Sequence, residues 1–177
     1  TAIVSATWQA GSLCSVNGTV ATAPTSLNQT FSNFAWNSAN QTAPITLNTA
    51  FVCNGNFSVL NSGSSQLVFP AATTYNFRGN MVLNDEVTFS NTGTYRFNGT
   101  SAQTISGTLA TVPPFGNLII ATTGAGSVIL NRSLGASNTF VIHCLLTKLH
   151  HLSYISFQLG VQTTRPYPLF CLFLPNV

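Results

Sequence analysis

The sequence predicts an all-β fold, a β-solenoid resembling a parallel β-helix, with a β-sandwich as the alternative. Three observations lead to this prediction: a scarcity of charge, short strand-like runs between polar turns, and internal repetition. Charged residues make up only 4% of the 177 residues, whereas they make up roughly 25% of an average soluble protein. Neutral Asn, Thr and Ser side chains can stack from coil to coil, where like charges would repel one another.

The strands are indicated by alternation of large apolar residues with smaller or polar ones. Tyr75 and Phe77 lie two positions apart, as do Tyr95 and Phe97, and residues at that spacing point to one face of a strand. The runs are short, end at Asn, Gly or Ser, and show no helical periodicity across residues 1–140. These features favour β structure throughout that region.

Three stretches with similar corners follow one another along the chain. They read "FVCNGNFSVLN" from Phe51, "YNFRGNMVLN" from Tyr75 and "YRFNGTSAQTIS" from Tyr95. In each, an alternating strand runs into an Asn-Gly or Arg-Gly corner and a new strand begins. We expect the corner glycines to supply the positive φ of a tight turn; they are Gly55, Gly79 and Gly99.

Longer-range repetition separates the two candidate folds. The dipeptide Leu-Asn occurs five times, where about two occurrences are expected by chance, and repetition of this kind is typical of solenoids. In addition, "TFSNFAWNSANQTAPITLN", ending at Asn48, aligns with "PFGNLIIATTGAGSVILN", ending at Asn131, which gives a period of 83 residues. A sandwich does not require a repeated register, so the repetition favours the solenoid.

The motifs themselves resemble a known repeat. "FNGTSAQTISGT", "FGNLII", "SVILN" and "NGNFSVLNSGSSQLVF" are similar to a repeat found in large secreted surface proteins of Bacteroidetes, and the resemblance covers roughly residues 28–140. It implies a β-helical stalk in an adhesin-like exported protein at the cell surface or outside the cell. It implies no particular ligand.

The composition changes abruptly near residue 140. All three histidines, the only lysine and two of the four cysteines lie in residues 141–177, which hold no Asp or Glu. We therefore expect a β-solenoid repeat domain at 1–140 and an atypical C-terminal segment at 141–177. Two interpretations of that segment stay open: a capping element, which solenoids need at their ends, or an out-of-frame tail.

The carboxylates are too few and wrongly placed for common hydrolytic chemistry. Asp85 and Glu86 are the only acidic residues. Neighbours in a strand point to opposite faces, so the two cannot flank one glycosidic bond. We expect them to be solvated charges in the turn after Asn84. No catalytic residues are assigned, and the protein is not expected to be an enzyme.

Metal and cofactor sites are not expected either. His143, His150, His151 and Cys144 are the only candidates for a soft metal, and their spacing matches no known signature. The four cysteines are widely separated with no CxxC, which argues against a zinc knuckle. Two interpretations of the cysteines remain open: they are small buried hydrophobic residues, or they pair in disulfides.

Four aromatic residues are candidates for stacking on sugar rings if they are exposed; because they fall within strand patterns, a core role is favoured. They are Trp8, Trp36, Tyr75 and Tyr95. The five basic residues are scattered, which is atypical of nucleic-acid binding. No apolar run is long enough to span a membrane.

These observations together lead to one expected function and one alternative. We expect a non-enzymatic extracellular structural or adhesin-like repeat domain that acts as a cell-surface stalk or scaffold in cell adhesion. The alternative is a carbohydrate-binding module of a secreted protein. Surface glycans or further copies of the chain are the expected partners.

Overall fold

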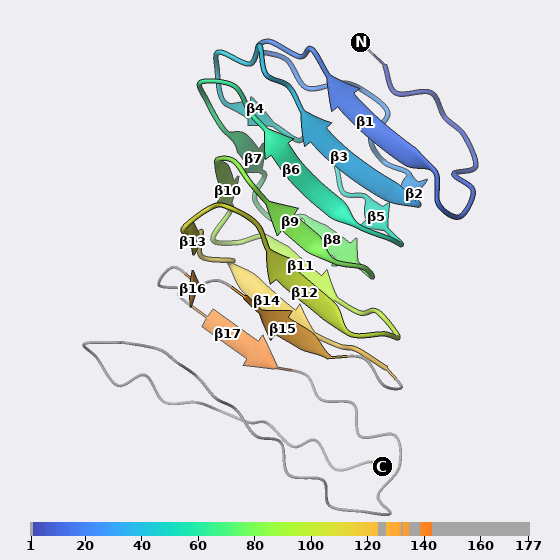
Figure 1. The fold of residues 1–177 in the computed structure, drawn as a ribbon, viewed down its shortest axis with the longest axis vertical. Helices are drawn as coiled ribbons and strands as arrows, with labels where there is room; N and C mark the ends of the chain where they lie inside the picture. The colour runs from blue at the N-terminus through green and yellow to red at the C-terminus, as the bar shows by residue number, and fades with distance from the viewer. Residues whose placement is uncertain (1, 124–126, 132, 135–138, 143–177) are drawn as a thin grey trace, which may run out of the picture.

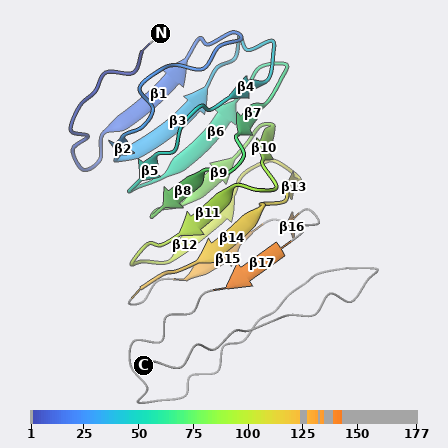
Figure 2. The same cartoon turned by 180° about the vertical axis from the view of Figure 1, so that it is seen from behind.

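The chain folds as a β-solenoid of about five turns, which confirms the predicted fold class. The computed structural model describes residues 2–123, 127–131, 133–134 and 139–142. Within this part of the chain every regular element is a strand and every strand pair is parallel. Figure 1 and Figure 2 show the coils stacked along the long axis, from β1 in blue to β17 in orange.

The coils present three sides. Sheet 1 is continuous and has six strands in the order β1 (Leu13–Asn17), β3 (Asn33–Asn37), β6 (Phe57–Asn61), β9 (Met81–Leu83), β12 (Gln103–Ser106) and β15 (Val128–Leu130). Sheet 2 is also continuous and runs through β2 (Thr30–Phe31), β5 (Val52–Cys53), β8 (Thr74–Phe77), β11 (Thr94–Phe97), β14 (Asn117–Ile120) and β17 (Thr139–Ile142).

The third side is interrupted. Three strands form one sheet, in the order β4 (Ile45–Thr46), β7 (Leu67–Phe69) and β10 (Val87–Phe89). A separate pair consists of β13 (Thr111–Val112) and β16 (Ser133–Leu134). Pro113 and Pro114 follow β13 directly, and proline has no backbone N–H to donate to a ladder.

The coils repeat every 20 to 25 residues, as the spacing of paired residues shows. The three similar stretches predicted from the sequence are confirmed as equivalent, because Cys53 pairs with Phe77 and Phe77 pairs with Phe97. The 83-residue correspondence is wrong as a structural repeat. It aligns β3 with β14, but β3 belongs to sheet 1 and β14 to sheet 2.

The Leu-Asn dipeptides also mark no single position of the coil. Leu83 ends β9 in sheet 1 and is buried, Leu47 follows β4 on the third side and is buried, and Leu60 is 41% exposed within β6. The dipeptide thus occupies different positions in different coils. Its spacing therefore carries no register.

The interior holds a continuous array of aromatic rings, here called the aromatic column: Phe31, Phe34, Phe51, Phe57, Phe69, Tyr75, Phe77, Phe89, Tyr95, Phe97 and Phe115. All are buried, and their ring centroids lie 4.3–6.4 Å apart from neighbour to neighbour. The period-2 pairs predicted to share a face do so, because the side chains between them point outward. Each coil thus packs on the rings of the next.

The corner between sheet 2 and sheet 1 corrects the predicted role of its glycines. Gly55, Gly79 and Gly99, here called the glycine corner, are not among the glycines with positive φ. Instead the backbones of successive coils meet there: a Cβ on Gly79 would overlap the backbone of Gly55, and one on Gly99 would overlap the carbonyl of Arg78. Glycine is needed for close approach of backbones rather than for an unusual turn.

The domain boundary proposed at residue 140 falls inside β17, which continues to Ile142. Residues 143–177 lie outside the described part of the chain, so both interpretations of the segment 141–177 stay predictions. The described residues contain no helix long and apolar enough to cross a membrane.

Candidate functional site

The two carboxylates lie where the sequence placed them, in the turn between β9 and β10, but Asp85 is more than a solvated charge. Its Oδ2 accepts a hydrogen bond of 2.7 Å from the backbone N–H of Ser62 in the preceding coil. Its Oδ1 accepts one of 2.8 Å from the N–H of Glu86, whose side chain is exposed. Asp85 therefore joins two coils.

The four candidate sugar-stacking residues lie mainly in the core. Trp36, Tyr75 and Tyr95 are fully buried, which leaves them no face for a ligand. Trp36 Nε1 donates to Gln41 Oε1 at 2.9 Å, and the Tyr75 hydroxyl donates to the Thr49 carbonyl at 3.1 Å. Burial raises the pKa of both tyrosines, so their hydroxyls stay protonated.

Trp8 differs from the other three in being only partly buried. Its ring lies 5.2 Å from that of Phe31, and its Nε1 donates to Gln29 Oε1 at 3.0 Å. The backbone N–H of Ala6 donates to the same oxygen. The N-terminal segment thereby covers the first ring of the aromatic column.

Two cysteines fall within the described residues, and both are free and buried. This confirms the interpretation of Cys14 and Cys53 as small buried hydrophobic residues. Desolvation raises the pKa of the Cys53 thiol to about 11. Cys144, Cys171, His143, His150 and His151 lie outside the described part of the chain, and within that part no cluster of residues suited to a metal occurs.

A ladder of asparagine side chains, which the sequence analysis missed, joins successive coils at the start of the sheet 1 strands. Asn33 Oδ1 accepts from the N–H of Asn56 at 2.8 Å. Asn56 and Asn80 repeat the arrangement with the next coils, at 3.1 and 2.9 Å. Each of the three precedes a large apolar residue, at spacings of 23 and 24; that pattern could have identified the ladder.

Gln103 holds the glycine corner from inside. It is fully buried, and its Oε1 accepts from the N–H of Gly99 at 2.8 Å. Its Nε2 donates to the carbonyls of Phe77 and Gly79 at 3.0 and 2.7 Å. The side chain thus satisfies three backbone groups in two coils, which buried polar groups require.

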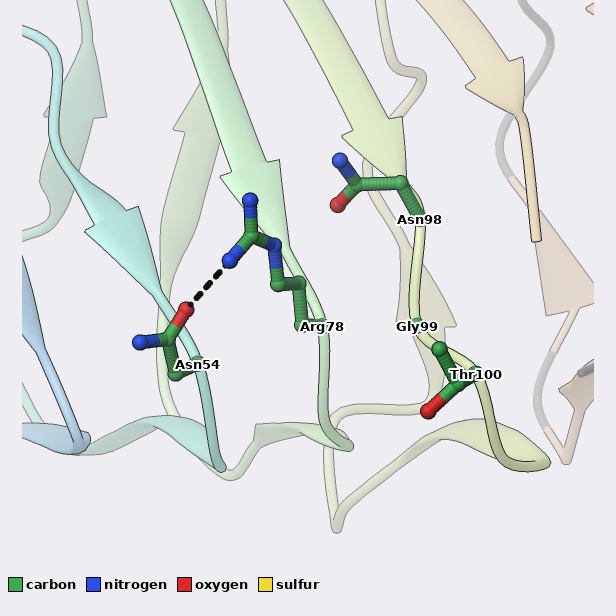
Figure 3. Close-up of a pocket in the computed structure, with 5 residues that line it drawn as sticks. All are labelled: Asn54, Arg78, Asn98, Gly99 and Thr100. Carbon is green, nitrogen blue, oxygen red and sulfur yellow. Dashed lines mark hydrogen bonds between the residues drawn. The ribbon is translucent and has the colours of Figure 1, made fainter. Parts of the chain in front are cut away.

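Outside this corner, a polar depression of about 370 Å³ is lined by Asn54, Arg78, Asn98, Gly99 and Thr100. Figure 3 shows Asn54, Arg78 and Asn98 in a row at the ends of β5, β8 and β11. The row follows from the register, because each residue comes directly after a paired strand end. Arg78 donates from one terminal nitrogen to Asn54 Oδ1 at 2.9 Å.

Among the described residues, Asn98 is the one with a shielded side-chain polar atom that lacks a hydrogen-bond partner. Its Nδ2 donates to Asn76 Oδ1 across a long 3.4 Å. Its Oδ1 is shielded from solvent and accepts no hydrogen bond within the described residues. The sequence analysis placed Asn98 in a repeat motif and did not identify its side-chain oxygen as a binding group.

Comparisons of the chain with models of protein families, with curated proteins and with solved structures found no match.

Proposed function

We propose that this chain is a non-enzymatic, extracellular structural domain of adhesin-like type, which acts as a stalk or scaffold at the cell surface. The observation that carries the proposal is continuity from coil to coil. Two six-stranded sheets run without a break along the solenoid, and the aromatic column runs inside them. A body connected in this way transmits load and keeps its length.

The connections between coils are of three independent kinds, which suits a spacer. Backbone ladders join the strands, aromatic rings pack across coils at 5.5–6.0 Å, as for Phe77 with Phe97 and Tyr75 with Tyr95, and the Asn ladder bridges the corner. Repeat arrays draw their stability from such nearest-neighbour interfaces. Hence a local defect need not separate the two ends.

The surface location can be tested on intact cells that produce the protein. An antibody against the chain should label these cells without permeabilisation, and protease added outside should remove the label. Deleting the gene should reduce attachment of the cells to a surface or to one another. Label seen only after lysis would contradict the surface role, and unchanged attachment would contradict the adhesive one.

The second candidate function, a carbohydrate-binding module, is favoured by a different observation from the one that suggested it. Burial removes Trp36, Tyr75 and Tyr95 as stacking platforms. The polar depression around Arg78 instead offers amide, hydroxyl and guanidinium groups, which are the groups that recognise sugar hydroxyls. A glycan array probed with the full chain tests this function, and binding to no glycan would exclude it.

A further inference from the structure

Arg78 carries a positive charge that no carboxylate neutralises within the described residues. It is exposed at the end of β8, and its recorded partner is the neutral amide oxygen of Asn54. The acidic pair Asp85 and Glu86 lies in the turn between β9 and β10, at a different corner of the coil. Since a guanidinium carries five donors in a planar fork, Arg78 keeps donors for a carboxylate.

Arg78 has donors that need an acceptor, whereas Asn98 has an acceptor that needs a donor. Its Oδ1 lacks a donor, and an amide oxygen without one is costly. The side chain is held by one long hydrogen bond, so a rotation that exposes the shielded Oδ1 to a ligand would break only that bond. Figure 3 shows the amide of Asn98 on the side of Arg78, with Thr100 beyond it. A ligand that donates from a hydroxyl would satisfy Asn98.

The two requirements together define a class of ligand. We propose that the depression binds a uronate residue of an acidic polysaccharide, whose carboxylate pairs with Arg78 and whose ring hydroxyl donates to Asn98. Arginine suits a planar carboxylate because two N–H groups can bind it in parallel. The volume of about 370 Å³ lies in the range of roughly 300–1,000 Å³ typical of small-molecule sites. This inference rests on the second candidate function and is independent of the stalk.

The test is titration of the full chain with trigalacturonate, followed by NMR of the backbone amides. The matched ligand is the methyl ester of the same trimer, which keeps the hydroxyls and the shape but loses the charge. We expect trigalacturonate to shift the Gly99 and Thr100 amides, and the ester to bind at least tenfold more weakly. Equal binding of acid and ester would overturn the carboxylate pairing.

Variants of the protein locate the site. Arg78→Gln should weaken trigalacturonate binding at least tenfold, and Asn98→Leu and Thr100→Val should weaken it several-fold. Arg96→Gln is the matched control, since Arg96 is exposed on the same sheet but does not line the depression; it should change binding less than twofold. Circular dichroism checks that each variant is folded.

The outcomes separate failure of this site from failure of carbohydrate binding. Equal losses in Arg78→Gln and Arg96→Gln would show general attraction between charges and overturn the site. Binding of trigalacturonate that survives Arg78→Gln would place the glycan elsewhere and overturn it too. Binding of neutral glycans alone would leave the module intact but refute the uronate, and no glycan binding at all would refute both.

Discussion

The interior of the solenoid and its glycine corner join the same coils in opposite ways. In the aromatic column, large rings fill space between coils, and Phe57 alone contacts Phe34, Phe69 and Phe77. At the glycine corner, the absence of a side chain lets the backbones of Gly55 and Gly79 meet directly. The aromatic column depends on the volume of its side chains, and the glycine corner depends on having no side chain.

This difference teaches how tightly each region constrains its residues. A core accepts another apolar residue of similar volume at modest cost, so many sequences would build the aromatic column. A Cβ has no room at the glycine corner, and two of its backbone groups, the Gly79 carbonyl and the Gly99 N–H, are satisfied by the side-chain amide of Gln103. We therefore expect the corner to fix the register and the interior to supply most of the stability.

Removing a ring from the interior should have the largest effect. We expect Phe57→Ala to lower the free energy of unfolding by about 3–5 kcal/mol, because it empties a fully buried site and leaves a cavity. Urea unfolding followed by circular dichroism measures this. Leu60→Ala in the same strand is the control, since Leu60 is 41% exposed, and a loss as large as that of Phe57→Ala would refute the dominance of the interior.

Removing the amide inside the corner should come next. Gln103→Leu keeps similar volume but leaves the Gly99 N–H and the Gly79 carbonyl without a partner, while the Phe77 carbonyl keeps the hydrogen bond from the Asn98 N–H, so we expect a loss of about 2–3 kcal/mol. Gln66→Leu is the comparison, because the side chain of Gln66 bonds Thr88 at an exposed position. Similar unfolding midpoints for the two variants would show that the buried amide of Gln103 stabilises the fold no more than the exposed amide of Gln66.

A Cβ at the corner should cost about 1–3 kcal/mol, the usual cost of overpacking. Gly79→Asn distinguishes close approach from positive φ, because Asn tolerates the left-handed region but adds a side chain. Gly18→Asn is the matched variant: Gly18 has φ +72° and open space around it. We expect Gly18→Asn to leave the thermal midpoint nearly unchanged and Gly79→Asn to lower it. The reverse order would restore the positive-φ explanation.

Breaking one rung of the Asn ladder should have the smallest effect. Asn80→Ala removes the acceptor of the Thr104 N–H, and we expect a loss of about 1 kcal/mol, typical of one hydrogen bond. Asn48→Ala, at an exposed position, should change stability by less than about 0.5 kcal/mol. Hydrogen exchange of the Thr104 amide reads the rung directly, and unaltered protection in Asn80→Ala would mean that the rung is not formed.

The sequence predicted the interior well because a period of two leaves a strong signal. Tyr75, Phe77, Tyr95 and Phe97 were assigned to one face of their strands, and all four are buried. The same alternation led to the all-β prediction, and internal repetition favoured the solenoid over the sandwich. Burial of large apolar residues depends on local pattern, and a local pattern is visible in a single chain.

The corner and the depression could not be predicted in the same way. The need for glycine at position 79 arises from the backbone of Gly55, a contact between residues one coil apart. Likewise, the row of Asn54, Arg78 and Asn98 depends on the register of β5, β8 and β11. The 83-residue alignment gave a wrong register, so these neighbours stayed hidden until the coils were in place.

The burial of Cys53 has a consequence for the proposed location at the cell surface. With a thiol pKa of about 11, only about one molecule in a thousand carries the thiolate at pH 8, and the thiolate is the species that reacts with oxidants and disulfides. If the protein is exported as proposed, we therefore expect Cys53 to react slowly with oxidants and disulfides and not to cross-link one copy to another. A free buried cysteine at this position is thus compatible with the proposed surface location.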